Sequence, residues 1–251
     1  MSDNIVVCKN CETKNRIPGH WSGRRPICSV CKVPFGEITL CLNPSCTKKL
    51  RIPVNEDIKR VKCPSCNSSF FLCSPTVPPG YEEFENAAYV DIETTSLSPS
   101  EGIITVLGIY LVEGCSHLII QLTEHELNKD KLFKIMDKKE VIYTFNGKRF
   151  DLPFIKEFVG IDLSKHHHHI DIMRLCHDNG YPGGLKLIEQ RLGIQRKNST
   201  IDGREAVNLW NRWRYEKDNH ALSQLLDYNK EDVFNLRTLR LKLKRNHRPL
   251  I

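Results

Sequence analysis

The sequence predicts an α/β protein, with a mixed β-sheet flanked by helices, preceded by two small cysteine-rich modules. Two observations predict this. From Ala87 onwards, apolar strand patterns come first and then alternate with amphipathic helical patterns. Before Ala87, cysteines recur in close pairs. The predicted boundaries are 1–36 for the first module, 37–73 for the second, 74–86 for a proline-rich linker, and 87–251 for the α/β domain.

Length and composition predict a protein that does not enter a membrane. The chain has 251 residues, and no stretch approaches the roughly 20 apolar residues that a membrane span needs. The first four residues, 1–4, carry no basic region of the kind that begins a signal peptide. We therefore expect a cytoplasmic protein.

The two cysteine-rich modules are copies of one another. In each copy, sixteen residues separate two close Cys pairs, Arg-Ile-Pro begins five residues after the second Cys, and a Phe falls four residues after the last Cys. An offset of 35 residues relates the copies, apart from a two-residue insertion in the first pair of the second copy. The cysteines are Cys8, Cys11, Cys28 and Cys31 in the first copy, and Cys41, Cys46, Cys63 and Cys66 in the second.

Cys pairs at this spacing suit tetrahedral zinc bound by four thiolates. Each pair would lie on a tight turn, with the spacer forming a hairpin that brings the pairs together. Each module is below the ~40 residues that a metal-free core needs, so metal would supply its folding energy. We predict two structural Zn²⁺ ions, with iron–sulfur ligation or a redox role as the alternative. Both modules resemble the zinc ribbons found at the front of many bacterial proteins, which implies binding or docking rather than chemistry.

The net positive charge of the chain lies in its N-terminal part. Residues 1–73 carry 12 Lys and Arg against 5 Asp and Glu, whereas residues 74–251 carry 25 of each. Two zinc sites with four thiolates each would lower the N-terminal charge from +7 to about +3. This bias is compatible with nucleic-acid binding by the ribbons, with docking of a protein partner, or with an ordinary solvated surface.

The elements of the α/β domain follow in order along the chain. Apolar, β-rich runs predict three antiparallel strands, and a pair of turn residues, Glu113 and Gly114, joins the last two. Alternating helices and strands follow. The predicted elements are strands at 87–91, at 103–112 with an interruption at Gly108, and at 116–122, a helix at 124–139, a strand at 141–145, a helix at 150–158, a strand end at 170–173, and mostly helix from 185 to 243.

Asp91 and Glu93 form the first candidate functional site. Residues two apart on a strand point to the same face, so the two carboxylates would lie side by side. Their mutual repulsion is commonly offset by a divalent cation with oxygen ligands. The alternative is an exposed strand end with two solvated acids.

Two more stretches carry candidate site residues. Asp151 follows a turn at Gly147 and begins a predicted helix, where it is either a site residue or a plain helix cap. Tyr228 and Asp232 are four residues apart on a predicted helix and share one face, which is either functional or simply solvated.

Together these stretches resemble the DEDD (DnaQ-like) exonuclease superfamily, in its tyrosine subtype. The D-x-E motif matches Asp91 and Glu93, the N-x3-[FY]-D motif matches Asn146 through Phe150 and Asp151, and the Y-x3-D motif matches Tyr228 and Asp232. The resemblance covers about residues 87–245 and is closest to YprB-like domains of the ribonuclease H type. It implies a ribonuclease-H-like sheet in the order predicted above.

The resemblance also implies a reaction. Asp91, Glu93, Asp151 and Asp232 would hold two Mg²⁺ or Mn²⁺ ions for phosphodiester hydrolysis at a 3′ end, with Tyr228 positioning the attacking water. Asn146, Lys148 and Arg149 are the predicted substrate contacts, and single-stranded 3′ ends the expected partner. The alternative for Lys148 and Arg149 is that they only solubilise the start of the helix. The rival hypotheses are a catalytically idle nuclease fold that acts as a binding scaffold, and endonuclease action by the same site. DNA and RNA are not distinguished.

Overall fold

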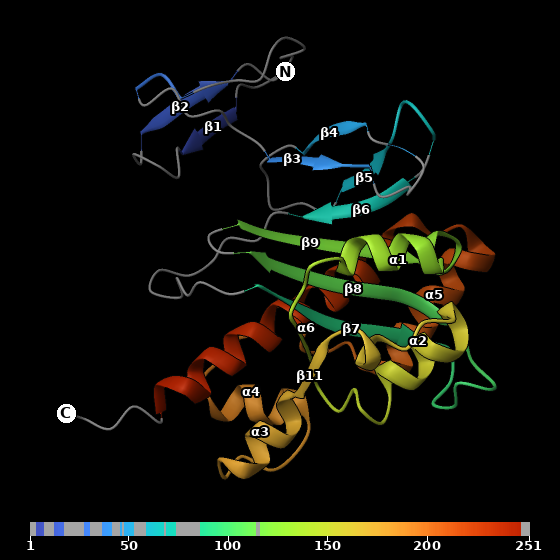
Figure 1. The fold of residues 1–251 in the computed structure, drawn as a ribbon, viewed down its shortest axis with the longest axis vertical. Coiled ribbons are helices and arrows are strands. Elements are labelled where there is room, and N and C mark those ends of the chain that lie inside the picture. Colours follow the sequence, from blue (N-terminus) through green and yellow to red (C-terminus); the bar gives the residue numbers. More distant parts are fainter. Residues whose placement is uncertain are drawn as a thin grey trace.

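A seven-stranded mixed β-sheet organises the computed structural model (Figure 1). The structure describes residues 4–7, 13–17, 28–30, 37–41, 46, 48–52, 59–67, 69–73, 86–113 and 116–246. Helices cover both faces of the sheet, which confirms the predicted α/β class. In the described part of the chain, no helix has both the length and the apolar character needed to cross a membrane.

The centre of the sheet is an antiparallel meander, with parallel strands added on one side. β7, β8 and β9 are antiparallel neighbours, while β10 runs parallel to β7 and β11 parallel to β10. In spatial order the strands are β11 (His168–Asp171), β10 (Val141–Thr144), β7 (Asn86–Thr94), β8 (Ile104–Glu113), β9 (Ser116–Thr123), β6 (Ser69–Cys73) and β5 (Lys59–Lys62).

Two predicted strand boundaries were wrong. β7 does not end at Asp91 but continues to Thr94, so Glu93 also lies within the strand. β8 passes through Gly108 without interruption, because Gly108 pairs with Asp91 in a regular ladder. The continuous ladder fixes the side-chain direction of both acids.

The helical stretches predicted at 124–139 and from 185 to 243 are divided, whereas the helix predicted at 150–158 is confirmed. Residues 172–173, predicted as a strand end, begin a helix instead. The helices are α1 (Lys129–Met136), α2 (Asp151–Val159), α3 (Ile172–Asp178), α4 (Leu185–Arg191), α5 (Gly203–Glu216) and α6 (Asn219–Asn246), with 3₁₀ turns η1 (Glu124–Glu126) and η2 (Leu163–Lys165). The single helix expected at 124–139 is split, because the Asn128 side chain accepts a hydrogen bond from the Lys131 amide at 2.8 Å and begins a new helix there.

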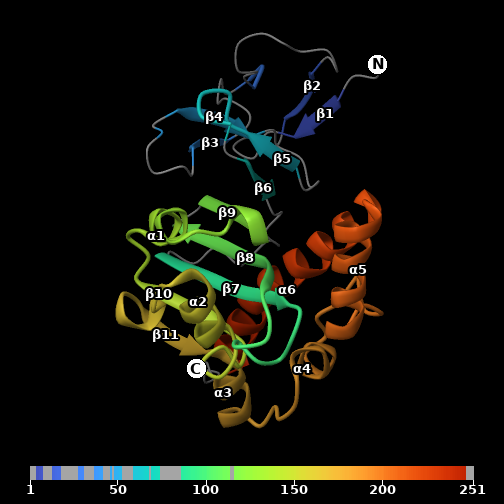
Figure 2. The ribbon, with the colours of Figure 1, turned by 90° about the vertical axis from the view of Figure 1, so that its right-hand side faces the viewer.

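Strand β7 divides the core into its two layers. Ala88, Val90 and Ile92 pack with α1 and α2 on one face, whereas Ala87 and Tyr89 pack with α3, α4 and α6 on the other. Figure 2 shows α1 and α2 on one side of the strands and α5 and α6 on the other. Because side chains alternate along a strand, the two acids of β7 face the α6 layer.

The N-terminal modules contain short antiparallel hairpins. β1 (Asn4–Val7) pairs with β2 (Lys14–Ile17), and β3 (Glu37–Leu40) pairs with β4 (Lys49–Ile52). Each of these hairpins encloses the first Cys pair of its module. In the second module the two spacer strands pair with strands outside the spacer, so the expectation of a spacer hairpin was wrong there, whereas most of the first spacer lies outside the described residues. β5 and β6 enclose the second pair of the second module, and β6 pairs with β9. This module is therefore hydrogen-bonded to the sheet of the α/β domain.

Candidate active site and cysteine centre

Three acids from two elements converge on the α6 face of the sheet. Asp91 and Glu93 come from β7, and Asp232 comes from α6. One carboxylate oxygen of each lies within 4.8 Å of the others. Glu93 and Asp232 are buried and Asp91 is half-buried. The structure therefore brings together residues that are 139 positions apart in sequence, in a cluster able to hold a metal ion.

Asp151 lies beside this cluster of three rather than within it. Its side chain is buried at the first residue of α2, where the backbone amides of Asp151 itself and of Ile92 stabilise the carboxylate. The turn before it contains Gly147, as predicted, but Gly147 is not its left-handed residue. The left-handed residue is Asn146, with φ of 61°, while Gly147 is needed because a Cβ there would fall 2.2 Å from Thr144 Oγ1.

The environment of the site disfavours the charged forms of its acids. Burial raises the pKa of Asp91 to about 7, against the lowering effects of Arg196 and of the Asn229 amide. Burial and the nearby Asp91 carboxylate also raise the pKa of Glu93 and that of Asp151. A divalent cation bound among these carboxylates would favour their ionised forms and offset the cost of burying them.

Tyr228 lies one helical turn before Asp232 and is buried. Its ring is approached by two cations, with Lys186 Nζ 5.2 Å and the Arg196 guanidinium carbon 5.7 Å from the ring centroid. Burial, with the charges of Glu93 and Asp91, raises the pKa of Tyr228. The hydroxyl therefore stays protonated near neutral pH.

Lys148 and Arg149, the predicted substrate contacts, are exposed in the turn before α2. Asn146 donates its backbone amide to the Asp171 carboxylate at 2.8 Å. Asp171 also accepts the backbone amides of Lys148 at 3.3 Å and Met173 at 3.1 Å. Asp171 thus ties the turn to the start of α3.

Sequence reasoning missed an amide pair that holds Asp91. Asn229 Nδ2 donates to Asp91 Oδ2 at 3.0 Å, and Gln121 Nε2 donates to Asn229 Oδ1 at 3.0 Å. Both amides are buried. The available signals were a glutamine inside an apolar strand and the glycine at 108, since a glycine in a strand often marks the close approach of another group.

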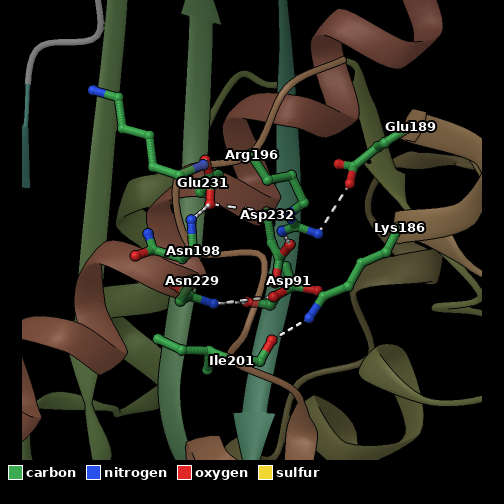
Figure 3. A network of polar contacts seen from close by, with 10 residues as sticks. Asp91, Lys186, Glu189, Arg196, Asn198, Ile201, Asn229, Glu231 and Asp232 are labelled. Atoms are coloured by element: carbon green, nitrogen blue, oxygen red, sulfur yellow. Dashed lines mark hydrogen bonds and ion pairs between the residues drawn. The ribbon is translucent and has the colours of Figure 1, made fainter. Parts of the chain in front are cut away.

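A group of charged side chains around Asp232, shown in Figure 3, was not predictable from the sequence. Arg196, from the loop between α4 and α5, forms ion pairs with Asp232 and with Glu189 of α4. Lys186 of α4 donates to the Ile201 carbonyl in the same loop. No local sequence motif predicts that these residues belong to the site, because they reach it only through the packing of α4 and its loop against α6.

Four cysteines of the second module form a separate cluster that fits zinc. The Sγ atoms of Cys41, Cys46, Cys63 and Cys66 all lie within 4.8 Å of one another. The Cys41–Cys66 separation is 3.4 Å and the Cys46–Cys63 separation is 3.8 Å. Tetrahedral zinc with bonds of ~2.3 Å places its sulfurs about 3.8 Å apart, so the four thiols fit this ion.

The first module is described only in part. Cys8, Cys11 and Cys31 lie outside the described residues, so the first predicted zinc site is not tested. Cys28 is buried, and its Sγ accepts a hydrogen bond from Asn15 Nδ2 at 3.6 Å.

Several known proteins are similar to parts of this chain. A solved structure of Brucella melitensis NrnC bound to pGG is 19% identical, with a TM-score of 0.45 over 67% of this chain and 76% of that chain. The family B DNA polymerase of Pyrobaculum calidifontis gives a TM-score of 0.46 at 16% identity, over 78% of this chain and 29% of that chain. The uncharacterized protein MJ0365 of Methanocaldococcus jannaschii is 27% identical over 160 residues, which are 58% of this chain and 88% of that protein.

A family model gives the assignment. The model described as the RNase_H superfamily matches residues 88–244, which run from the third residue of β7 to near the end of α6 and contain all the acids of the site. The match covers more than half of the chain, and the protein therefore belongs to the RNase_H superfamily.

Proposed function

We propose that this protein is a metal-dependent 3′–5′ exonuclease that hydrolyses nucleic-acid phosphodiester bonds. The observation that carries the proposal is the convergence of Asp91, Glu93 and Asp232, with Asp151 beside them and Tyr228 one turn before Asp232. Carboxylates of this number and proximity are the oxygen donors that Mg²⁺ and Mn²⁺ prefer.

The protein's own groups have separate roles in this proposal. When bound, a pair of divalent cations supplies water activation and stabilises charge on the leaving oxygen. The four carboxylates hold the cations, and Asn229 keeps Asp91 oriented. Tyr228, which is protonated near neutral pH, donates a hydrogen bond that orients the attacking water and does not act as a base. The exposed Lys148 and Arg149 attract the phosphates of the substrate.

The direction of cleavage and the subtype rest on the three sequence motifs. Their tyrosine-type pattern supports a single-stranded 3′ end as substrate. For the ribbons we propose two structural zinc ions, one in each module, and a role in gripping nucleic acid or docking a partner. The second of these sites is supported by its sulfur geometry.

A nuclease assay tests the proposal. Single- and double-stranded DNA and RNA, labelled at the 5′ end, are incubated with the protein and Mg²⁺ or Mn²⁺. Asp91→Asn and Asp232→Asn serve as active-site variants, and Asp178→Asn, an exposed acid on α3, is the matched control. We expect a metal-dependent ladder that shortens from the 3′ end with the wild type and the control, and none with the two active-site variants.

Other results lead to the rival hypotheses. Internal cuts lost in the same variants would change the reaction to an endonuclease. Binding of nucleic acid without cleavage would favour an idle scaffold. The Arg196–Asp232 ion pair is the one observation that favours this second function, because a resident arginine on a metal ligand is compatible with a site that uses no metal.

A further inference from the structure

Arg196 is a buried cation that faces the acidic cluster. Its side chain is 6% exposed, and it reaches Asp232 through Nη2 and Glu189 Oε2 through Nη1 at 3.0 Å. Its Nε lies 3.9 Å from Glu231. A buried guanidinium is tolerated only with such partners, because removing the charge from water is costly. Asp232 is a proposed metal ligand, whereas Glu189 and Glu231 are not.

Arg196 and a divalent cation would compete for Asp232. The guanidinium hydrogen bond occupies a lone pair of the Asp232 carboxylate that a metal ligand would otherwise offer. It also places a positive charge at hydrogen-bonding distance from that carboxylate, where a second cation is repelled. Full occupancy of the metal site therefore favours a position of Arg196 away from Asp232.

Glu189 can form a second hydrogen bond to the Arg196 guanidinium when Arg196 leaves Asp232. Its side chain is fully buried, and its Oε1 atom makes no hydrogen bond of regular geometry among the described residues. Burial raises the pKa of Glu189 to about 7, while Arg196 and the neighbouring Asn235 amide lower it. Arg196 Nε likewise makes no hydrogen bond to any residue that the structure describes. A bidentate arginine–carboxylate pair uses two N–H groups and both carboxylate oxygens. Nη1 already holds Oε2 of Glu189, so Nη2, once released from Asp232, can complete an end-on bidentate pair with Oε1.

The loop that carries Arg196 is held independently of Asp232. Glu231 accepts the backbone amides of Lys197 at 2.6 Å and Asn198 at 3.0 Å. Figure 3 shows Glu231 beside Asn198. Ile194 and Ile201 are buried at the two ends of this segment. A change of partner by Arg196 therefore needs only a rotation of its side chain, with the loop backbone in place.

We propose that Arg196 is a resident counter-cation of the acidic site, which pairs with Asp232 until a divalent cation binds and then pairs with Glu189 alone. The inference rests on the proposed function, since it requires a metal site at Asp91, Glu93 and Asp232. Its consequence is that Arg196 weakens metal binding, whereas Glu189 strengthens it.

Titration calorimetry with Mn²⁺ on the full-length, zinc-loaded protein tests this directly, without a nuclease readout. We expect Arg196→Gln to bind Mn²⁺ at least tenfold more tightly than wild type, and Glu189→Gln to bind it about tenfold more weakly. Arg212→Gln is the matched control, because Arg212 forms an ion pair with Asp218 on the surface and is 43% exposed. It should bind Mn²⁺ as wild type does.

The possible outcomes separate the inference from the function on which it rests. Equal or weaker binding by Arg196→Gln, with wild type binding Mn²⁺, would overturn the inference and leave the metal site standing, with Arg196 merely positioning Asp232. Absence of Mn²⁺ binding in every variant would overturn both. Should Arg196→Gln fail to fold, as thermal unfolding would show, tighter or unchanged binding by Glu189→Gln would still overturn the inference.

Discussion

Asn229 connects the strand that carries the first acids to the helix that carries the last. Its amide nitrogen holds Asp91, and its amide oxygen accepts the hydrogen bond of Gln121. Gln121 Nε2 also donates to the Leu226 carbonyl of α6 at 2.8 Å. Because both amides are buried, losing one partner would leave the other unsatisfied, at a cost of about 1–3 kcal/mol.

Gly108 provides the space that Asn229 occupies. A Cβ at this position would fall 2.2 Å from Asn229 Oδ1 and 3.0 Å from a Val233 methyl group. We expect Gly108→Ala to lower the free energy of unfolding by about 1–3 kcal/mol, because α6 must shift away from β8. The same shift should reduce nuclease activity at least tenfold.

Chemical denaturation and the nuclease assay measure the effects of Gly108→Ala. Gly203→Ala is the matched control, since a Cβ there meets nothing within 4 Å at the start of α5. This control should retain wild-type stability and activity. If Gly108→Ala behaved in the same way, the close packing of α6 on β8 would be wrong.

At the residue scale, the acids were predictable but their neutral partners were not. Asp91, Glu93 and Asp232 stand in short motifs whose spacing follows strand and helix periodicity. Gln121 and Asn229 belong to different elements, 108 positions apart, and no local pattern pairs them. Arg196 was also unpredictable, because a lone arginine in a loop is ordinarily a solvated residue.

At the element scale, α1 links the cysteine centre to the α/β domain. Lys134 Nζ donates to the carbonyl oxygens of Cys41 at 2.9 Å and Cys46 at 3.4 Å. Burial lowers the pKa of Lys131, and Glu126 with the thiols of Cys41 and Cys66 opposes this effect. Zinc with four thiolates carries a net charge of −2, so these lysines stabilise the centre electrostatically.

Removal of one lysine should therefore weaken zinc binding. We expect Lys134→Ala to lower the zinc affinity of the second module about tenfold, which is the usual scale for a group that orients metal ligands. Competition with a chromogenic chelator at pH 7.4 measures the affinity. Lys129→Ala, an exposed lysine on the same helix, should leave it unchanged. Equal affinities of the two variants would show that α1 does not support the centre.

Also at the element scale, hydrophobic spacing predicts where helices lie but not where they break. Hydrophobic spacing located α2 correctly, because Leu152, Phe154 and Ile155 are buried on its inner face. The same spacing joined η1 and α1 into one helix. The break arises from side-chain capping by Asn128, because such a local hydrogen bond competes with helix continuation.

At the scale of the whole molecule, the second cysteine module extends the sheet. β6 pairs with β9 at Phe71–Gln121, Leu72–Ile120 and Cys73–Ile119 (Figure 1). Cys41, Cys46, Leu50 and Cys63 belong to the same buried cluster as the core residues of β7, β8, α1 and α2. Without this hairpin, β9 would be an unprotected edge of the sheet.

Loss of zinc from the second module should therefore reduce the protection of the β9 backbone amides against hydrogen exchange. We expect Cys63→Ser to increase hydrogen exchange of the backbone amides at 119–121, because the β6 ladder would be lost, while the amides of β7 stay protected. Exchange measured by mass spectrometry on the full-length protein tests this. Cys28→Ser in the first module is the control and should leave β9 exchange unchanged. Unchanged β9 exchange in Cys63→Ser would mean that the hairpin holds without its metal.

The sequence by itself determined the α/β class and the antiparallel order of the first three strands. It also identified the cysteines and the acids as candidate metal ligands. Strand and helix periodicities and ligand spacings are local properties, so they are readable along the chain. Only the tertiary structure decided which side chains hold the acids, which cation faces Asp232, and that β6 joins β9. These contacts join segments far apart in sequence, and their geometry depends on how buried faces pack together.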